Sequence, residues 1–355
     1  MFTRTLDRAK EQKNDEFYTQ LSDIEKEMRH YKEHFRGRVV FCNCDDPYES
    51  NFFKYFCLGF NFLGLKRLIA TCYKGSAVSN RQLSLFDDES EDDKTTRVAH
   101  KIIINEGIDE NGDGAYDLQD IVLSLAKNKN NTLTKLEGDG DFRSDECIEL
   151  LKESDIVVTN PPFSLFREYV DQLIKYNKDF IIIGNTNALT YKETFKLIKE
   201  NKIRTGYTNF NVGMYFYVPD SSSQFHREDN GKKMVRVSTS CWFTTLPVKK
   251  HQEELTLYKA YSPKDYPKYD NYDAINVDKY LDIPGDYDGI MGVPVTFLDK
   301  YNPDQFELIG LCAGAKELDI VGLERNEAIK DARALINGKN TYARIFIRKR
   351  GKNEN

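Results

Sequence analysis

The feature that most constrains the fold is a short apolar run that ends abruptly in two prolines. Ile156, Val157 and Val158 are β-branched and uninterrupted, which is typical of a parallel strand buried on both faces. Pro161 and Pro162 have no N–H to donate, so they end the hydrogen-bonded ladder and stiffen the turn that follows. Because open α/β sheets bind ligands at the carboxyl ends of their strands, this turn is predicted to line a binding site.

The residue types in this turn indicate a specific chemistry. The Asn160 side chain and the Pro161 carbonyl offer two acceptors, which suit a planar amino group such as the exocyclic N6 of adenine. Holding both of its hydrogens withdraws the nitrogen lone pair from ring conjugation and makes the nitrogen a better nucleophile. Phe163 adds a flat face on which an extruded base can stack. No titrating general base is required.

The tetrapeptide resembles the Asn-Pro-Pro-Phe signature of N6-adenine methyltransferases. The resemblance implies that the catalytic residues are Asn160, Pro161, Pro162 and Phe163. The alternative interpretation is a turn that begins a helix, with proline at the first helical positions.

Size and composition allow one large catalytic domain and a smaller one in 355 residues. The start of the chain is charged rather than apolar, and no run reaches the roughly 18 apolar residues of a membrane span, so we expect a cytoplasmic, nucleoid-associated protein with no membrane partner. The seven cysteines lack disulfide-framework spacing, which favours reduced thiols. The net charge of -6 is concentrated in an acidic segment near residues 87–93, while basic residues gather at 232–236 and 344–352, so nucleic acid is a possible partner.

A nucleotide-like cofactor is expected where the first strand, residues 38–43, ends. The glycine-rich turn that most methyltransferases carry there is absent. Asp45 and Asp46 can accept hydrogen bonds from a ribose diol or an amino-acid ammonium, both of which S-adenosylmethionine carries. Alternatively, one of them caps the helix that follows.

The segment Cys42–Pro47, together with Asn14–Thr19 ahead of the strand, resembles the EcoRI-type family of adenine-specific DNA methyltransferases, and the likeness extends from about residue 12 to about residue 320. The family resemblance implies a Rossmann-like α/β sheet that binds S-adenosylmethionine, with the gamma order of motifs. It also implies a cofactor contact from Asp141, whose carboxylate can accept from the adenine amino group, and from Phe142, whose ring can cover the base. The predicted cofactor-binding residues are Phe17, Tyr18, Thr19, Asn43, Cys44, Asp45, Asp46, Asp141 and Phe142.

Residues 75–97 are rich in Gly, Ser, Asn and acidic side chains, and this composition predicts a mobile loop. Within the loop lies a pentapeptide that resembles the motif by which bacterial enzymes dock on the replication sliding clamp. It consists of Gln82, Leu83, Ser84, Leu85 and Phe86. The alternative is that its apolar side chains fold back onto their own domain.

We expect no metal site. Cys42 and Cys44 are too close together for a zinc pair and no second pair matches them. The segment that starts at Asp109 mimics a calcium loop, but Asp120 replaces the usual bidentate Glu, so we interpret it as a turn into a helix over 116–126.

The order of the remaining elements predicts a catalytic domain over residues 1–248 and a C-terminal DNA-recognition region over 249–355. A third strand is expected to end within residues 136–142, and helices are expected over 144–153, 164–177 and 190–200, with a strand at 180–184. Residues 206–218 and 234–246 are predicted to form a long hairpin that closes the sheet. Beyond residue 250 we expect an irregular module with strands near 289–298 and 306–310 and a basic tail.

The sequence therefore predicts a monomeric, site-specific enzyme that methylates N6 of an adenine flipped from double-stranded DNA, as part of a restriction–modification system or derived from one. Two alternatives remain open at this point. One is an N-methyltransferase for RNA or a protein amide, and the other is a catalytically inactive, clamp-associated DNA-binding regulator.

Overall fold

The computed structural model describes residues 18–44, 50–71, 99–114, 116–127, 130–218, 225–229, 231–313, 316–318, 320–326, 329 and 333–351. The chain divides into two compact units. The first comprises Met1–Asn185 and Gly206–Leu246, and the second comprises Thr186–Thr205 and Pro247–Asn355. The second unit thus includes residues 186–205, which the sequence analysis assigned to the catalytic domain.

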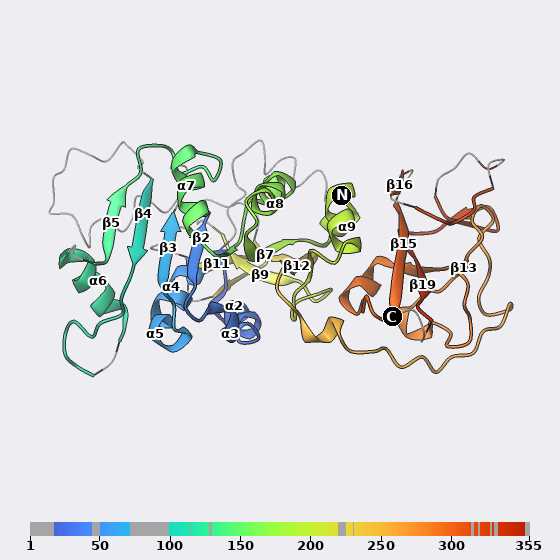
Figure 1. Ribbon diagram of the computed structural model, residues 1–355, viewed down its shortest axis with the longest axis horizontal. Helices are drawn as coiled ribbons and strands as arrows, with labels where there is room; N and C mark the ends of the chain where they lie inside the picture. Colours follow the sequence, from blue (N-terminus) through green and yellow to red (C-terminus); the bar gives the residue numbers. More distant parts are fainter. Residues whose placement is uncertain are drawn as a thin grey trace. The chain divides into compact units, whose positions relative to one another are not determined.

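The first unit is built on a large mixed sheet (Figure 1), which makes the fold α/β. Strands β3, β2, β6 and β7 are mutually parallel, whereas β4, β5 and β12 run antiparallel to their neighbours. In sheet order the strands are β5 (Thr132–Lys135), β4 (His100–Ile104), β3 (Arg67–Thr71), β2 (Val39–Asn43), β6 (Ile156–Thr159), β7 (Asp179–Asn185) and β12 (Ser240–Thr244). Every residue of β2 and β6 is buried, as the uninterrupted apolar runs predicted.

The helices of the first unit form because their apolar residues recur at helical spacing. In α8, for example, Phe166, Tyr169, Val170 and Leu173 are buried. Serine side chains cap two helices: Ser50 accepts from the N–H groups of the first turn of α4, and Ser144 does so for α7. The helices are α2 (Leu21–Met28), α3 (Lys32–Phe35), α4 (Asn51–Leu58), α5 (Phe60–Leu63), α6 (Leu118–Lys127), α7 (Asp145–Glu153) and α8 (Phe166–Lys175).

The predicted long hairpin of residues 206–218 and 234–246 forms only in part. β9 (Met214–Tyr217) does pair antiparallel with β11 (Lys232–Val237), but the rest of the second half, β12, leaves this pairing and joins the main sheet. β12 pairs with β7 in the main sheet, while β9 pairs with β11 in a separate four-stranded sheet of order β1-β9-β11-β10. The chain turns sharply at Ser238 and Thr239, and Gly213 lies so close that an added Cβ would be 2.7 Å from the Ser238 Cα. The strands of this second sheet are β1 (Tyr18–Thr19), β9 (Met214–Tyr217), β10 (Arg227–Asp229) and β11 (Lys232–Val237).

The third strand also differs from its prediction, since β5 ends at Lys135 and residues 136–142 form turns. Within this stretch the φ of Gly140 is +76°, a conformation that ends a strand.

The second unit contains a five-stranded sheet of order β13-β14-β19-β15-β16. The expected basic tail is wrong, because residues 344–349 form the central strand β19, in which Ile345, Phe346 and Ile347 are completely buried. Its basic side chains bind within the unit: Arg344 donates to Asn276, and Arg348 pairs with Glu307 at 2.7 Å. The other elements are β8 (Arg204–Thr205), α9 (Lys192–Lys199), β13 (Ile275–Asn276), β14 (Met291–Pro294), β15 (Phe306–Ala313), β16 (Lys316–Leu318) and the hairpin of β17 (Leu335–Ile336) and β18 (Lys339–Asn340), with 3-10 turns that include Thr186–Thr190, Lys249–His251 and Val295–Asp299.

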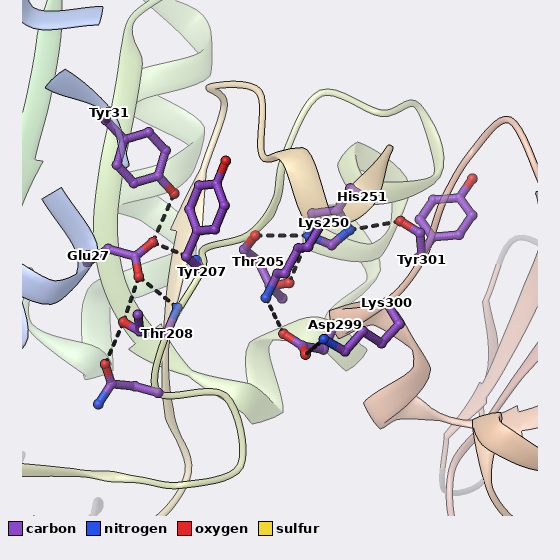
Figure 2. Close-up of polar contacts among 11 residues, drawn as sticks. Glu27, Tyr31, Thr205, Tyr207, Thr208, Lys250, His251, Asp299, Lys300 and Tyr301 are labelled. Carbon is purple, nitrogen blue, oxygen red and sulfur yellow. Dashed lines mark hydrogen bonds and ion pairs between the residues drawn. The ribbon is translucent and has the colours of Figure 1, made fainter. Parts of the chain in front are cut away.

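A buried histidine links separate segments of the second unit (Figure 2). The His251 ring lies between the carbonyl oxygens of Tyr301, at 2.8 Å from Nδ1, and Thr205, at 3.0 Å from Nε2. Burial lowers the pKa of His251 to about 4, so the ring is neutral and one nitrogen carries no proton. The Thr205 hydroxyl, 3.2 Å from Nε2, can donate to that nitrogen.

In the part of the chain that the structure describes, every cysteine is a free thiol. None of the helices there combines the length and the apolar character that crossing a membrane requires.

Candidate active site

Each of the four parallel strands ends in a buried polar residue, and all four ends lie at the same edge of the sheet. The residues are Thr71 of β3, Asn43 of β2, Thr159 of β6 and Asn185 of β7, with exposed fractions of 0%, 1%, 0% and 7%. Polar side chains are buried at a cost unless they make hydrogen bonds, so this edge is chemically distinct from the apolar interior of the sheet. It is the edge at which ligands of α/β sheets bind.

The Asn-Pro-Pro-Phe segment continues directly from β6 at this edge. Pro161 is buried, while Asn160, Pro162 and Phe163 are half-buried. The first backbone hydrogen bond of the following 3-10 turn runs from Leu165 to the carbonyl of Pro162, at 3.0 Å, and therefore does not use the Pro161 carbonyl. The turn is thus compatible with a Pro161 oxygen that accepts from a ligand.

Phe163 contacts Phe216 of β9, edge to face, with ring centroids 6.3 Å apart. Phe216 is fully buried, so it is a fixed support for the half-buried ring of Phe163. No local pattern in the sequence indicates this contact, because Phe163 lies in the turn after β6 whereas Phe216 lies in β9 of the four-stranded sheet.

Asn43 is held by two side chains from other elements. The Tyr169 hydroxyl of α8 donates to its Oδ1, and the Thr159 hydroxyl donates to its backbone carbonyl. Its Nδ2 is buried and has no hydrogen-bond partner among the residues that the structure describes. The amide is therefore oriented with an unused donor, and Tyr169, which the sequence analysis missed, is the residue that orients it.

Thr19 offers a second unused group. It lies in β1, its carbonyl accepts from Asn51 Nδ2 at 2.7 Å, and Asn51 begins the helix that follows β2. Its buried hydroxyl has no partner within the described ranges of the chain. Tyr18 is half-buried beside it. Of the other predicted cofactor residues, Phe17, Asp45 and Asp46 lie outside the described residues.

Cys44 occupies the position where most methyltransferases carry a glycine-rich turn. Its φ is +73°, the left-handed conformation that glycine adopts without strain and other residues adopt at a cost. The backbone therefore turns as a glycine would turn it. The departure from the glycine-rich turn is the only sequence feature that supports the alternative of a catalytically inactive protein.

Asp141 and Phe142 lie in a turn ahead of α7 rather than at the end of a strand. Arg143 binds both Asp141 oxygens, from Nε at 2.8 Å and from Nη2 at 2.6 Å, and these bonds lower the pKa of the carboxyl. The carboxylate is thus held ionised as an acceptor, although part of its hydrogen-bonding capacity is already used. The Phe142 ring is buried and packs edge-on against Tyr169 at 5.0 Å.

A completely buried carboxylate anchors the loop that leads into β9 (Figure 2). Glu27 Oε1 accepts from Tyr31 Oη and the backbone N–H of Tyr207, and Oε2 accepts from the backbone N–H and hydroxyl of Thr208, all at 2.6–2.9 Å. Burial raises the pKa of Glu27, and the four donors oppose that rise. The sequence alone does not distinguish Glu27 from the other charged residues of its helix.

The carboxylates of the calcium-like segment serve their own backbone. Asp109 accepts from the N–H groups of Gly112, Asp113 and Gly114, and Asp120 accepts from those of Glu110 and Asn111. No group of three metal-ligand side chains occurs within the ranges that the structure describes. The clamp-like pentapeptide at residues 82–86 lies outside those ranges.

Comparison with known proteins gives a family match over almost the whole chain. The family model for the adenine-specific methyltransferase EcoRI matches residues 5–350. The type II methyltransferase M.EcoRI of Escherichia coli is 47% identical over 97% of this chain and 96% of the relative. Two further type II methyltransferases, M.MgeORF184P of Mycoplasma genitalium and M.MpnI of Mycoplasma pneumoniae, are 38% and 36% identical, each over 97% of this chain and 98% of the relative. No solved structure matches the chain.

Proposed function

Because this chain belongs to the EcoRI family of adenine-specific methyltransferases, we propose that its Asn-Pro-Pro-Phe turn transfers a methyl group from S-adenosylmethionine to N6 of an adenine extruded from duplex DNA. The observation that supports this most directly is the position of the turn, at the carboxyl edge where four parallel strands end in buried polar residues. The relatives are type II methyltransferases, so the biological setting is restriction–modification.

The residues present fit the cofactor that the family implies. Two buried groups of the first unit, the Thr19 hydroxyl and the Asn43 amide nitrogen, have no partner among the described residues. They could bind the ribose hydroxyls or the carboxylate of S-adenosylmethionine. Asp141 could accept from its adenine amino group. When bound, S-adenosylmethionine supplies an activated methyl group on its sulfonium sulfur.

The catalytic turn acts by positioning. The Asn160 side chain and the Pro161 carbonyl accept the two N6 hydrogens of the adenine and fix the direction of the nitrogen lone pair. The Phe163 ring, supported by Phe216, stacks on the base. Fixing the nucleophile at a site shielded from water is a major source of rate enhancement in displacement reactions. The nitrogen that gains the methyl group becomes positively charged and acidic, so one of its two hydrogens then leaves to solvent as a proton without a titrating base. The second unit would recognise the sequence around the target base.

Replacing Asn160 tests this proposal. We expect Asn160→Ala to bind S-adenosylmethionine with nearly normal affinity by calorimetry, and to lose methylation of duplex DNA by at least about two orders of magnitude, since removal of one well-placed hydrogen-bonding group in a catalytic site costs that much. Near-normal turnover by Asn160→Ala would overturn the assignment. Parallel assays with structured RNA and protein acceptors test the two other substrate classes.

Docking on a replication sliding clamp is a separate proposal that rests on the sequence of residues 82–86 alone. If the pentapeptide is an anchor, purified clamp should bind the intact protein and lose affinity for the double variant Leu85→Ala, Phe86→Ala. Equal binding by both proteins would remove the proposal. We propose that the enzyme acts as a monomer in the cytoplasm, where its DNA is accessible.

A further inference from the structure

The small sheet of the first unit lies next to the catalytic turn. Its strand β9 contributes Phe216, whose ring contacts Phe163. In the register of the sheet, Phe216 is opposite Thr19, which carries one of the unused buried hydroxyls. One face of this sheet, formed by alternate residues of its strands, therefore belongs to the active site.

The opposite face of the sheet is aromatic and basic. Because side chains alternate along a strand, Tyr215 and Tyr217 point away from the face that carries Phe216. The register places Arg236 opposite Tyr215, and both Tyr217 and Arg227 opposite Met234. We call this surface the aromatic–basic face. Its polar and aromatic members are Tyr18, Tyr215, Tyr217, Arg227, Lys232, Arg236 and the single acidic residue Asp229, and the buried Met234 lies among them.

The cations of this face are held in place by their neighbours. The Arg227 guanidinium lies 4.2 Å from the centroid of the Tyr215 ring, and Lys232 Nζ lies 5.8 Å from that of Tyr217. Arg236 donates one N–H to the carbonyl of Val212 at 2.9 Å. All three basic residues are exposed. Stacking and hydrogen bonding restrict the side chains in advance, so binding an anion costs less conformational entropy than it would with free side chains.

We infer that the aromatic–basic face binds the phosphate backbone of the duplex that flanks the extruded adenine. The chain as a whole carries a net charge of -6, so a polyanion must approach it through a locally positive surface. Three basic residues oppose one acidic residue among the described members of this face. By contrast, the basic residues of β19 bind carboxylates and carbonyls of their own unit.

The position of the face supports the same partner. A second stacked cation of the first unit, Lys32 over the Phe62 ring at 4.5 Å, lies on α3 and α5, which immediately precede β2 and β3. That end of the sheet is opposite the edge at which Phe163 lies. The aromatic–basic face belongs to the small sheet that contacts Phe163, whereas Lys32 lies at the other end of the main sheet and is the matched control, a cation stacked on an aromatic ring.

The inference rests on the proposed function and is tested by the salt dependence of DNA binding. A phosphate contact contributes about 0.9 to the slope of log K against log salt concentration. We expect Arg227→Gln, Lys232→Gln and Arg236→Gln each to lower that slope by up to about 1, and to weaken binding to cognate and unrelated duplexes equally. Lys32→Gln should leave the slope unchanged. Tyr215→Leu, which keeps every charge, should weaken binding several-fold through loss of the ring beneath Arg227.

Unchanged slopes in all three charge variants would overturn the inference, and so would a weakening confined to cognate DNA, which would mean base contacts instead of phosphate contacts. Circular dichroism of each variant confirms that it is folded before binding is measured. The proposed function fails independently, if the unaltered protein does not methylate duplex DNA or if Asn160→Ala remains active.

Discussion

The buried carboxylate of Glu27 gives a sharp test of how the loop ahead of β9 is held. The backbone N–H groups of Tyr207 and Thr208 donate to different oxygens of Glu27, each at 2.7 Å. In Glu27→Gln one of these oxygens becomes an NH₂ group, so in either orientation of the amide one buried N–H faces another donor. A hydrogen bond to a charged acceptor contributes about 1.5–3 kcal/mol, and an unsatisfied buried donor costs about 1–3 kcal/mol, so we expect a loss of about 3–5 kcal/mol in the free energy of unfolding.

The chain contains an internal probe for this experiment. Trp242 is its single tryptophan, is completely buried, and donates from Nε1 to Asn209 Oδ1 of the same loop at 3.3 Å. Urea unfolding followed by tryptophan fluorescence therefore reports on the region that the substitution affects. Glu25→Gln, an identical change at an exposed position of the same helix, is the control and should cost less than about 0.5 kcal/mol. If both variants unfold at the same urea concentration, the Glu27 carboxylate does not stabilise the loop and the reasoning is refuted.

Three further predictions concern other parts of the chain. Burial lowers the pKa of His251 to about 4, so the neutral ring should contribute fully to stability above pH 6.5. As the pH falls from 6.5 towards 4, the free energy of unfolding should decrease by up to about 3 kcal/mol. Thermal unfolding followed by circular dichroism should show this pH dependence, and His251→Gln should reduce it. Gly184→Ala should lower the free energy of unfolding, measured with urea, by about 1–3 kcal/mol, because the added Cβ would lie 2.4 Å from a ring atom of Phe166 in α8. Gly138→Ala is the control and should be tolerated, because its added Cβ would have no neighbour within 4 Å. Phe216→Leu should lower kcat about tenfold with little change in KM, because it removes the support of Phe163, and Phe216→Tyr should restore the rate; a change in KM alone would contradict this role.

The sequence predicted those structural features that depend on residues adjacent in the chain. The strand–proline–aromatic segment at 156–163 predicted β6, its end and the turn that follows, because β-branched runs and proline act through local backbone geometry. The family resemblance, carried by the same segment and by Cys42–Pro47, is confirmed by the match over residues 5–350. The roles of the individual site residues remain proposals.

Only the tertiary structure decided which distant residues meet. Tyr207 reaches Glu27 across 180 residues of sequence and Tyr169 reaches Asn43 across 126, and no local periodicity records such a pairing. The same limit explains why the basic tail and the full length of the hairpin differ from expectation. A basic segment at the end of the chain is a tail or a central strand depending on whether β14 and β15 flank it. Two β-rich runs pair along their whole length only if no other strand edge takes part of one of them, and here β7 pairs with β12 while β9 pairs with β11. Strand pairing is decided by competition among edges throughout the chain, which a single stretch of sequence does not contain.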